Sequence, residues 1–328
     1  MRIFVNIPDG FRNNSFITPA IREYLAKVGD VTYNPSPAPL GGAGLGEALA
    51  DQDVVITGWG QPLISKDNIG SVKLIVHTGG TVGGIVDLGV FDLGVTVLSG
   101  NRYYAESVAE GTLSYMLFAL RNMGYYGSMM KKGEWTWEAH TEGLIGQSVG
   151  IVSYGAISSR LIPKLRLFTD KIKVYSTHQD EELAKREGFT YATLEEIFKT
   201  CKVVSVHTAK NPETYHMINR KHFDMLADGA LFINTSRGAV IDEQALIDTL
   251  KENRFKALLD VYESEPPKED NELRNLDNVT LFPHMAGPTY DMRERITGYL
   301  IDDIVRFEKG EKVENEVTKA VAEQMTIA

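Results

Sequence analysis

Three segments of this 328-residue chain place ionisable side chains directly after apolar runs. Arg237 follows the run at 230–233, and a guanidinium in that position could bind a carboxylate through two parallel hydrogen bonds. His284 follows the run at 279–282, and an imidazole that titrates near neutral pH suits a general acid and base. Glu265 could orient that imidazole and favour its protonated form. Each side chain alone could be an ordinary surface residue, but the three in this order indicate acid–base chemistry on an anionic substrate.

A turn of small residues after the apolar run at 149–152 is a second candidate site. The apolar residues that follow it, at 157, 161 and 165, have helical spacing. Free N–H groups at the start of such a helix can bind a pyrophosphate, usually through the pattern G-x-G-x-x-G. Here the three positions are Ser153, Gly155 and Ser158, and Gly155 is the one that lets the backbone approach a phosphate. The turn by itself fits either a dinucleotide site or an ordinary strand-to-helix connection.

A glycine-rich loop at 78–84 is a third candidate site, because it follows an apolar run that ends at His77. A loop of this kind at the carboxyl end of a parallel strand exposes backbone N–H groups where ligands bind. A flexible connection without a ligand is an equally good interpretation of the same residues.

Short apolar runs alternate with helix-like stretches along the whole chain. We expect strands at 2–5, 54–57, 73–77, 95–98, 148–152, 171–176, 202–207, 230–234, 257–260 and 279–282, and helices at 17–28, 104–123, 156–168, 193–200, 242–253 and 291–309. Residues 34–46, rich in Pro and Gly, are predicted to be a surface connection, and Trp135 and Trp137 are predicted to have a packing role and not a catalytic one. The alternation predicts parallel sheets with right-handed crossovers. The expected fold class is therefore α/β, with two doubly wound domains and a cleft between them.

The composition limits the possible functions. The formal net charge of -10, without a basic patch, argues against binding to nucleic acid or to an anionic membrane surface. We find no apolar run long enough to span a bilayer, and the first residues lack the pattern of a signal peptide. The single cysteine, Cys201, fits a reducing compartment and is expected to be a buried structural thiol. These features predict a cytoplasmic protein, and no metal site is expected.

Over nearly its whole length the chain resembles the D-isomer-specific 2-hydroxyacid dehydrogenases, which include D-lactate, phosphoglycerate and glyoxylate/hydroxypyruvate enzymes. The likeness is strongest over 148–287. It rests on the segments 150–157, 206–218, 232–242, 259–266 and 283–287, and on Val-Ala-Glu at 108–110, which matches the start of the family's interdomain helix. The resemblance implies a Rossmann cofactor domain at 105–287 and a flavodoxin-like substrate domain at 1–104 that is completed by 288–328.

The resemblance also implies an activity and roles for single residues. The enzyme would transfer a hydride between NAD(P)H and C2 of a small 2-keto acid or D-2-hydroxy acid, and it would form a homodimer largely through its cofactor domain. Arg237 would bind the substrate's carboxylate and keto oxygen, His284 would be the acid/base, and Glu265 its partner. Gly79, Gly80 and Thr81 would add backbone donors to the carboxylate. The residues implied for the cofactor are Gly155, Ala156, Ile157, Ser176, Thr208, Thr235, Ser236, Gly287 and, at the nicotinamide carboxamide, Asp260.

The chain departs from the family pattern at several positions. Ser153 and Ser158 replace two glycines, so the pyrophosphate turn could be altered, and the glycine-rich substrate loop also differs from the commoner form. Ser176 stands where NAD-using members carry an aspartate, so the cofactor is NAD or NADP, with NADP favoured. A catalytically weak, corepressor-like relative of the same fold and another Rossmann-type enzyme, such as a methyltransferase, are the alternatives. Formate dehydrogenases place glutamine where Glu265 stands, which argues against them.

Overall fold

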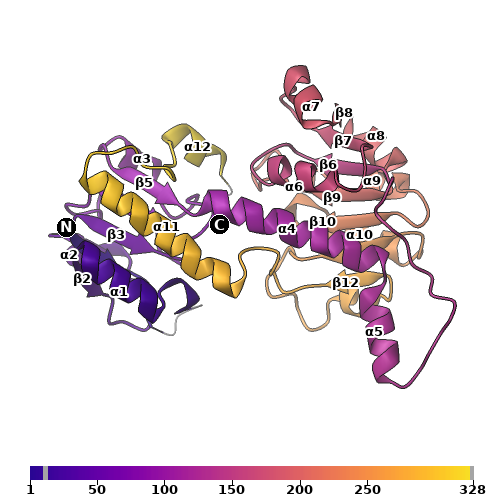
Figure 1. Ribbon diagram of the computed structural model, residues 1–328, viewed down its shortest axis with the longest axis horizontal. Helices are drawn as coiled ribbons and strands as arrows, with labels where there is room; N and C mark the ends of the chain where they lie inside the picture. Colours follow the sequence, from indigo (N-terminus) through magenta and orange to yellow (C-terminus); the bar gives the residue numbers. More distant parts are fainter. Residues whose placement is uncertain (10–13, 326–328) are drawn as a thin grey trace. The chain divides into compact units, whose positions relative to one another are not determined.

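The computed structural model describes residues 1–9 and 14–325 and divides the chain into two compact units (Figure 1). The first unit comprises Met1–Ala105 and Pro288–Ala328, and the second comprises Glu106–Gly287. Helix α4 (Asn101–Leu120) contains residues of both units. Each unit is built around one sheet whose strands are all parallel.

The sheet of the first unit has the strand order β2-β1-β3-β4-β5, which is the order of flavodoxin-like folds. Its strands are β1 (Arg2–Val5), β2 (Asp30–Tyr33), β3 (Val54–Thr57), β4 (Leu74–His77) and β5 (Thr96–Ser99). Its helices, besides the first residues of α4, are α1 (Pro19–Val28), α2 (Gly42–Leu49), α3 (Leu88–Phe91), α11 (Tyr290–Glu308), α12 (Lys319–Gln324) and the short 3-10 helix η1 (Asn14–Phe16).

Both faces of this sheet are buried, as the continuous apolar runs of the strands require. Along β1, Ile3 and Val5 belong to one apolar cluster, which includes residues of α1 and α11. Phe4, which lies between them, belongs to a second cluster with residues of α2, α3 and α12. Helices α1 and α11 also pack against each other (Figure 1). The first unit is therefore a three-layer α/β sandwich.

The sheet of the second unit has the strand order β12-β11-β10-β9-β6-β7-β8. The order from β11 to β8 is that of the dinucleotide-binding Rossmann fold, and β12 extends it by one strand. The strands are β6 (Val149–Val152), β7 (Ile172–Tyr175), β8 (Thr190–Tyr191), β9 (Val203–Val206), β10 (Leu231–Asn234), β11 (Lys256–Leu259) and β12 (Val279–Leu281). The helices, besides α4, are α5 (Met123–Lys131), α6 (Ser158–Leu165), α7 (Glu181–Glu187), α8 (Leu194–Thr200), α9 (Arg220–Met225), α10 (Glu243–Leu250), η2 (Gly238–Val240) and η3 (Glu272–Asn275).

Two apolar clusters cover the faces of the second sheet. Residues of α4, α6 and α7 pack on one face, where Ile151 of β6 lies, and residues of α8, α9 and α10 pack on the other, where Val152 lies. Cys201 is 1% exposed in the second of these clusters, so the prediction of a buried thiol is confirmed. The predicted α/β fold with two doubly wound parallel sheets is likewise confirmed.

The structure differs from the sequence-based prediction in some details. The stretch at 34–46 is only partly a connection, because α2 begins at Gly42; Leu45 and Leu49, four residues apart, are fully buried and hold its glycine-rich turn on the sheet. Trp135 and Trp137 do not pack in the interior, since they are 64% and 89% exposed and contact each other edge to face.

The helix predicted at 104–123 is shorter at its C-terminal end and is followed by a second helix. Asn122 adopts a left-handed conformation (φ +48°) between α4 and α5, and this breaks the helix. Within the described part of the chain, none of the helices combines the length and the apolar character needed to cross a membrane.

Candidate active site

The candidate catalytic residues follow three neighbouring strands of the second unit. Arg237 comes after β10, Glu265 after β11 and His284 after β12. These strands are parallel and lie side by side in the sheet, so their carboxyl ends form one continuous edge. The fold thus brings together three side chains that are up to 47 positions apart in the sequence, from 237 to 284.

His284 and Glu265 form a hydrogen-bonded pair. The distance between His284 Nδ1 and Glu265 Oε2 is 2.7 Å, and the other carboxylate oxygen of Glu265 accepts a hydrogen bond from the Tyr262 amide at 3.1 Å. The His284 side chain is 47% exposed. Because Nδ1 is directed at the carboxylate, Nε2 is the ring atom that can exchange a proton with a ligand.

The electrostatic surroundings keep Glu265 ionised. Burial alone would raise the pKa of Glu265, but the hydrogen bond and charge of His284, the Tyr262 amide and the charge of Arg237 together bring this pKa below its usual value. The ionised carboxylate can accept a hydrogen bond from the imidazole but cannot donate one to it. The pair can therefore hold a proton for transfer.

Arg237 is fixed by the turn that carries it. Asn234, which is fully buried, accepts hydrogen bonds from the Ser236 amide (3.0 Å) and hydroxyl (2.8 Å), and its amide group donates to the Arg237 carbonyl (3.1 Å). The Arg237 guanidinium donates to the Ser236 carbonyl at 2.7 Å. Burial lowers the pKa of Arg237, and the nearby charge of Glu265 opposes that shift.

Gly238 explains why a glycine follows the arginine. A Cβ atom at this position would lie 1.9 Å from the Tyr262 carbonyl carbon and 2.3 Å from the Glu263 nitrogen. The backbone after Arg237 therefore packs directly on the peptide between Tyr262 and Glu263, which lies in the loop that carries Glu265. The glycine is needed for this close approach between the two loops.

Asp260 holds the loop that carries His284. Its carboxylate is 1% exposed and accepts hydrogen bonds from the Met285 amide (2.8 Å), the Ala286 amide (2.9 Å) and the Tyr115 hydroxyl (3.0 Å). His284 itself has φ +53°, a left-handed conformation that is costly by about 1 kcal/mol for a residue with a side chain. The amide contacts of Asp260 stabilise this turn; its implied contact with the nicotinamide stays a prediction.

The turn between β6 and α6 has serine at two of its three glycine positions. Ser153 takes φ +78°, the region that usually needs glycine, and the Ser158 hydroxyl donates to the Ser153 carbonyl at 2.6 Å. The hydroxyls of Ser153 and Thr208 share a hydrogen bond at 2.7 Å. A Cβ atom added at Gly155 would meet no heavy atom within 4 Å. This open backbone at the start of α6 fits a dinucleotide pyrophosphate.

The other residues implied for a cofactor also lie in the second unit. Ser176 is half-buried after β7, and its hydroxyl donates to the His178 carbonyl at 2.6 Å. Thr235 and Ser236 are buried, and both hydroxyls make hydrogen bonds within the protein. The Thr235 hydroxyl contacts the Thr112 hydroxyl at 3.0 Å, and the Ser236 hydroxyl donates to Asn234. A Cβ atom at Gly287 would meet nothing within 4 Å. The contacts of all these residues, and of Ala156 and Ile157, with a cofactor stay predictions.

The glycine-rich loop at 78–84 belongs to the first unit. It follows β4, and a Cβ atom at Gly79 would lie 2.2 Å from Nε2 of the buried His77 ring, while one at Gly80 would lie 3.1 Å from the Tyr104 ring. Burial lowers the pKa of His77 to about 3, so this imidazole is neutral at physiological pH. The Thr81 hydroxyl accepts a hydrogen bond from the Gly83 amide at 3.2 Å. The two rings shape the loop, whose contact with a substrate stays a prediction.

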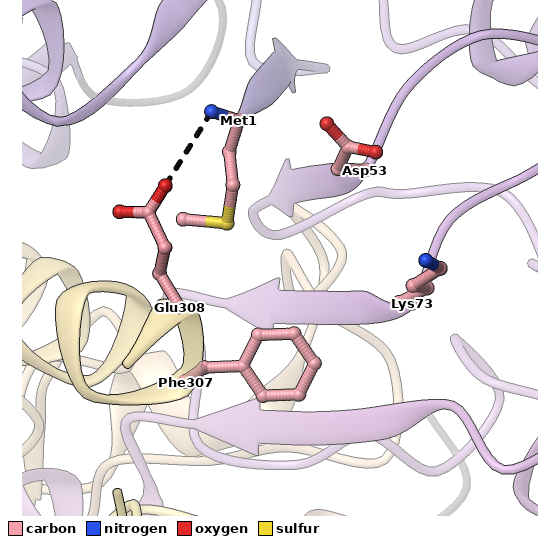
Figure 2. Close-up of a pocket in the computed structure, with 5 residues that line it drawn as sticks. All are labelled: Met1, Asp53, Lys73, Phe307 and Glu308. Carbon is pink, nitrogen blue, oxygen red and sulfur yellow. Dashed lines mark ion pairs between the residues drawn. The ribbon is translucent and has the colours of Figure 1, made fainter. Parts of the chain in front are cut away.

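The first unit has a pocket of about 330 Å³, and none of the predicted site residues lines it (Figure 2). It is lined by Met1, Asp53, Lys73, Phe307 and Glu308. Met1, Asp53 and Lys73 directly precede β1, β3 and β4 and so mark the amino ends of these strands. Ligands of doubly wound folds bind at the carboxyl ends. Among the described residues, no group of His, Cys, Asp and Glu side chains could hold a metal ion.

Sequence reasoning missed three residues that support the site, namely Asn234, Thr112 and Tyr115. Asn234 was visible only as the first residue of the arginine motif. Tyr115 lies on the apolar face of α4, and a buried tyrosine needs a partner for its hydroxyl. That need was a usable signal, but the partner, Asp260, is 145 residues away.

Comparison with known proteins places the chain among dehydrogenases. Residues 113–286 match the family model described as D-isomer specific 2-hydroxyacid dehydrogenase, NAD binding domain. A glyoxylate reductase from Thermococcus litoralis is 33% identical over 237 residues, which cover 70% of this chain and 71% of that enzyme. A D-3-phosphoglycerate dehydrogenase from Methanocaldococcus jannaschii is 31% identical over 278 residues, which cover 83% of this chain. The match spans only 52% of the length of that relative.

The fold is also found among solved structures. A D-lactate dehydrogenase from Aquifex aeolicus, solved with NAD and lactic acid, aligns with a TM-score of 0.73 and 25% identity. The alignment covers 95% of this chain and 96% of that one.

Proposed function

The chain belongs to the D-isomer-specific 2-hydroxyacid dehydrogenase family, and we propose that it transfers a hydride between NAD(P)H and C2 of a small 2-keto acid or D-2-hydroxy acid. The observation that carries this proposal is the joint placement of Arg237, Glu265 and His284 on the loops after three adjacent strands. An arginine supplies charge for a carboxylate, and a histidine–carboxylate pair supplies and takes up a proton. Reduction of a ketone beside a carboxylate needs both.

Arg237 would bind the substrate's carboxylate and polarise its keto oxygen. Its guanidinium is partly buried, and a charge in such surroundings interacts more strongly than one in water. As reduction proceeds, negative charge develops on the keto oxygen, and a fixed cation there stabilises the transition state. The Asn234 contacts that hold this turn would keep the guanidinium in place.

His284 would exchange the proton through Nε2, while Glu265 holds Nδ1. A bound nicotinamide would supply or accept the hydride at C2. In reduction His284 donates to the developing alkoxide, and in oxidation it accepts from the hydroxyl. Gly155, Ala156 and Ile157 would hold the pyrophosphate, with Thr208, Thr235, Ser236, Asp260 and Gly287 towards the nicotinamide and Ser176 at the adenosine ribose.

We also propose that the chain forms a homodimer through the second unit. An arm formed by α5 and residues 132–137 carries Tyr125, Met130, Trp135 and Trp137, which are between 49% and 89% exposed. Large apolar side chains gathered on one segment are typical of protein–protein interfaces, in which tryptophan and tyrosine contribute most of the binding energy. A second copy of this chain is the partner that the family resemblance implies.

The first prediction tests the activity itself. The unmodified chain should reduce at least one short 2-keto acid, and Arg237→Ala should lower kcat/KM by roughly 30- to 5,000-fold, because losing a two-pronged contact to a charged group costs about 2–5 kcal/mol. NADH or NADPH binding, followed by fluorescence, should change little. Arg220→Ala is the matched control, because Arg220 is an exposed ion-paired residue of α9. Near-normal turnover of Arg237→Ala would contradict the assignment.

The second prediction concerns pH. Reduction needs protonated His284, so its rate should fall as pH rises, and oxidation should show the opposite limb. Because the pKa of Glu265 lies below its usual value, its carboxylate stays charged throughout the range from about pH 5 upward. Glu265→Gln removes that charge but keeps the shape of the side chain, so the reduction limb should move to lower pH. Profiles of kcat/KM against pH check this, and an unmoved limb would show that Glu265 does not favour the protonated ring.

The third prediction concerns the choice of cofactor. Ser176 carries no charge that would repel a 2′-phosphate, so kcat/KM should be similar for NADPH and NADH or higher for NADPH. Ser176→Asp should lower kcat/KM for NADPH by about tenfold or more, through like-charge repulsion, and spare NADH. Ser176→Ala, which adds no charge, is the control. A preference of the unmodified chain for NADH of about a hundredfold, ~2.7 kcal/mol, would refute this proposal.

The fourth prediction tests the dimer. Trp137→Glu should shift the chain from dimer to monomer in sedimentation velocity at micromolar concentration, without lowering the Tm of the monomer, because this side chain is 89% exposed. Leu167→Glu is the matched control, since Leu167 is 84% exposed but lies beyond α6, outside the arm. An unmodified chain that sediments as a monomer would contradict the proposal.

A further inference from the structure

One segment of α4 contacts all three loops that carry the catalytic side chains. Gly111 lies against the backbone of Ala286, where a Cβ atom would come within 2.6 Å of the carbonyl oxygen. Thr112 shares a buried hydrogen bond with Thr235, two residues before Arg237. Tyr115 donates to Asp260 at 3.0 Å. All of these contacts lie within the second unit.

Burial and ring stacking hold Tyr115 in place, in addition to its hydrogen bond to Asp260. Its side chain is 6% exposed, and its ring stacks on Phe282 with the ring centroids 4.5 Å apart and the planes within 2°. Phe282 is two residues before His284, and its amide donates to the Leu259 carbonyl at 2.9 Å, next to Asp260. The tyrosine thus holds the chain on both sides of the histidine, at Phe282 by stacking and at residues 285–286 through Asp260.

The hydroxyl of Tyr115 can act only as a donor towards Asp260. Burial and the Asp260 carboxylate raise the pKa of Tyr115, so the phenol is neutral throughout the working range. Asp260 Oδ1 accepts both this hydroxyl and the Met285 amide, while Oδ2 accepts the Ala286 amide. The tyrosine is thus one of three donors to this carboxylate, and the other two belong to the left-handed turn at His284.

We propose that Tyr115 is a positioning residue for His284, acting through Asp260 and Phe282. This inference rests on the proposed function, because it states how the acid/base of that reaction is held. Without the hydroxyl, Asp260 would keep its two amide partners in the His284 loop but lose the donor that anchors it to α4. His284 would then sample positions in which Nε2 is misdirected, and proton transfer would suffer more than binding.

The test is Tyr115→Phe, which keeps the stack on Phe282 and removes only the hydroxyl. Ser114→Ala is the matched control, because it removes an exposed hydroxyl that bonds only within the same helix, to the Gly111 carbonyl. Hydrogen exchange of the Met285 and Ala286 amides, followed by NMR, should be about tenfold faster in Tyr115→Phe than in the control. This measurement needs neither substrate nor cofactor.

Kinetics then separate positioning from a loss of folded protein. In Tyr115→Phe, kcat for 2-keto acid reduction should fall about tenfold, with KM for both substrates within twofold. The solvent deuterium isotope effect on kcat should rise, because proton donation becomes more rate-limiting. An unfolded fraction would lower the apparent kcat but would change neither KM nor the isotope effect. The concentration of folded sites, counted by NADH fluorescence, corrects kcat for that fraction.

The outcomes are distinct. Faster exchange at 285–286 together with a lower kcat and a larger isotope effect supports the proposal. Exchange or kcat equal to those of Ser114→Ala would overturn it. If the unmodified chain reduced no 2-keto acid, the proposed function would fail, and the exchange rates would still decide whether Tyr115 holds the His284 loop.

Discussion

The geometry of the site depends on the hydrogen bonds that the buried carboxylate of Asp260 accepts. This carboxylate accepts the amides of Met285 and Ala286, and these hold His284 in a left-handed conformation that the chain would otherwise avoid. A buried carboxylate without partners would be costly, so the amides and the Tyr115 hydroxyl stabilise it as much as it stabilises them. The direction of the imidazole is thus set by hydrogen bonds that no ligand needs to provide.

The second constraint is the close approach of backbones at Gly238. The loop after β10 packs on the Tyr262–Glu263 peptide, so the position of Arg237 depends on the position of the Glu265 loop. Glu265 in turn bonds His284. Arginine, carboxylate and imidazole therefore behave as one assembly along the edge of the sheet. A displacement of any one of the three loops would therefore displace the other two.

Much of this arrangement could be predicted from the sequence. Continuous apolar runs predicted most of the strands, because parallel strands that are buried on both faces consist of such runs. The predicted ends of these strands then pointed to Arg237, Glu265 and His284 as site residues. What could not be predicted depends on contacts between distant segments. Tyr115 donates to Asp260, which is 145 residues away in the sequence. Gly238 packs against the backbone of Tyr262, which is 24 residues away. The exposure of Trp135 and Trp137 could not be predicted either, because it depends on where the chain runs after Asn122, at which α4 is broken.

The central claim is that Arg237 and the His284–Glu265 pair meet at one reacting carbonyl. A crystal structure of the unmodified chain with NADH and oxamate, an unreactive isostere of a 2-keto acid, tests this most directly. The account predicts the oxamate carboxylate on the Arg237 guanidinium and the amide oxygen of oxamate within hydrogen-bond distance of His284 Nε2, with Nδ1 still on Glu265. Oxamate bound away from Arg237, or an imidazole turned so that Nε2 faces Glu265, would contradict it.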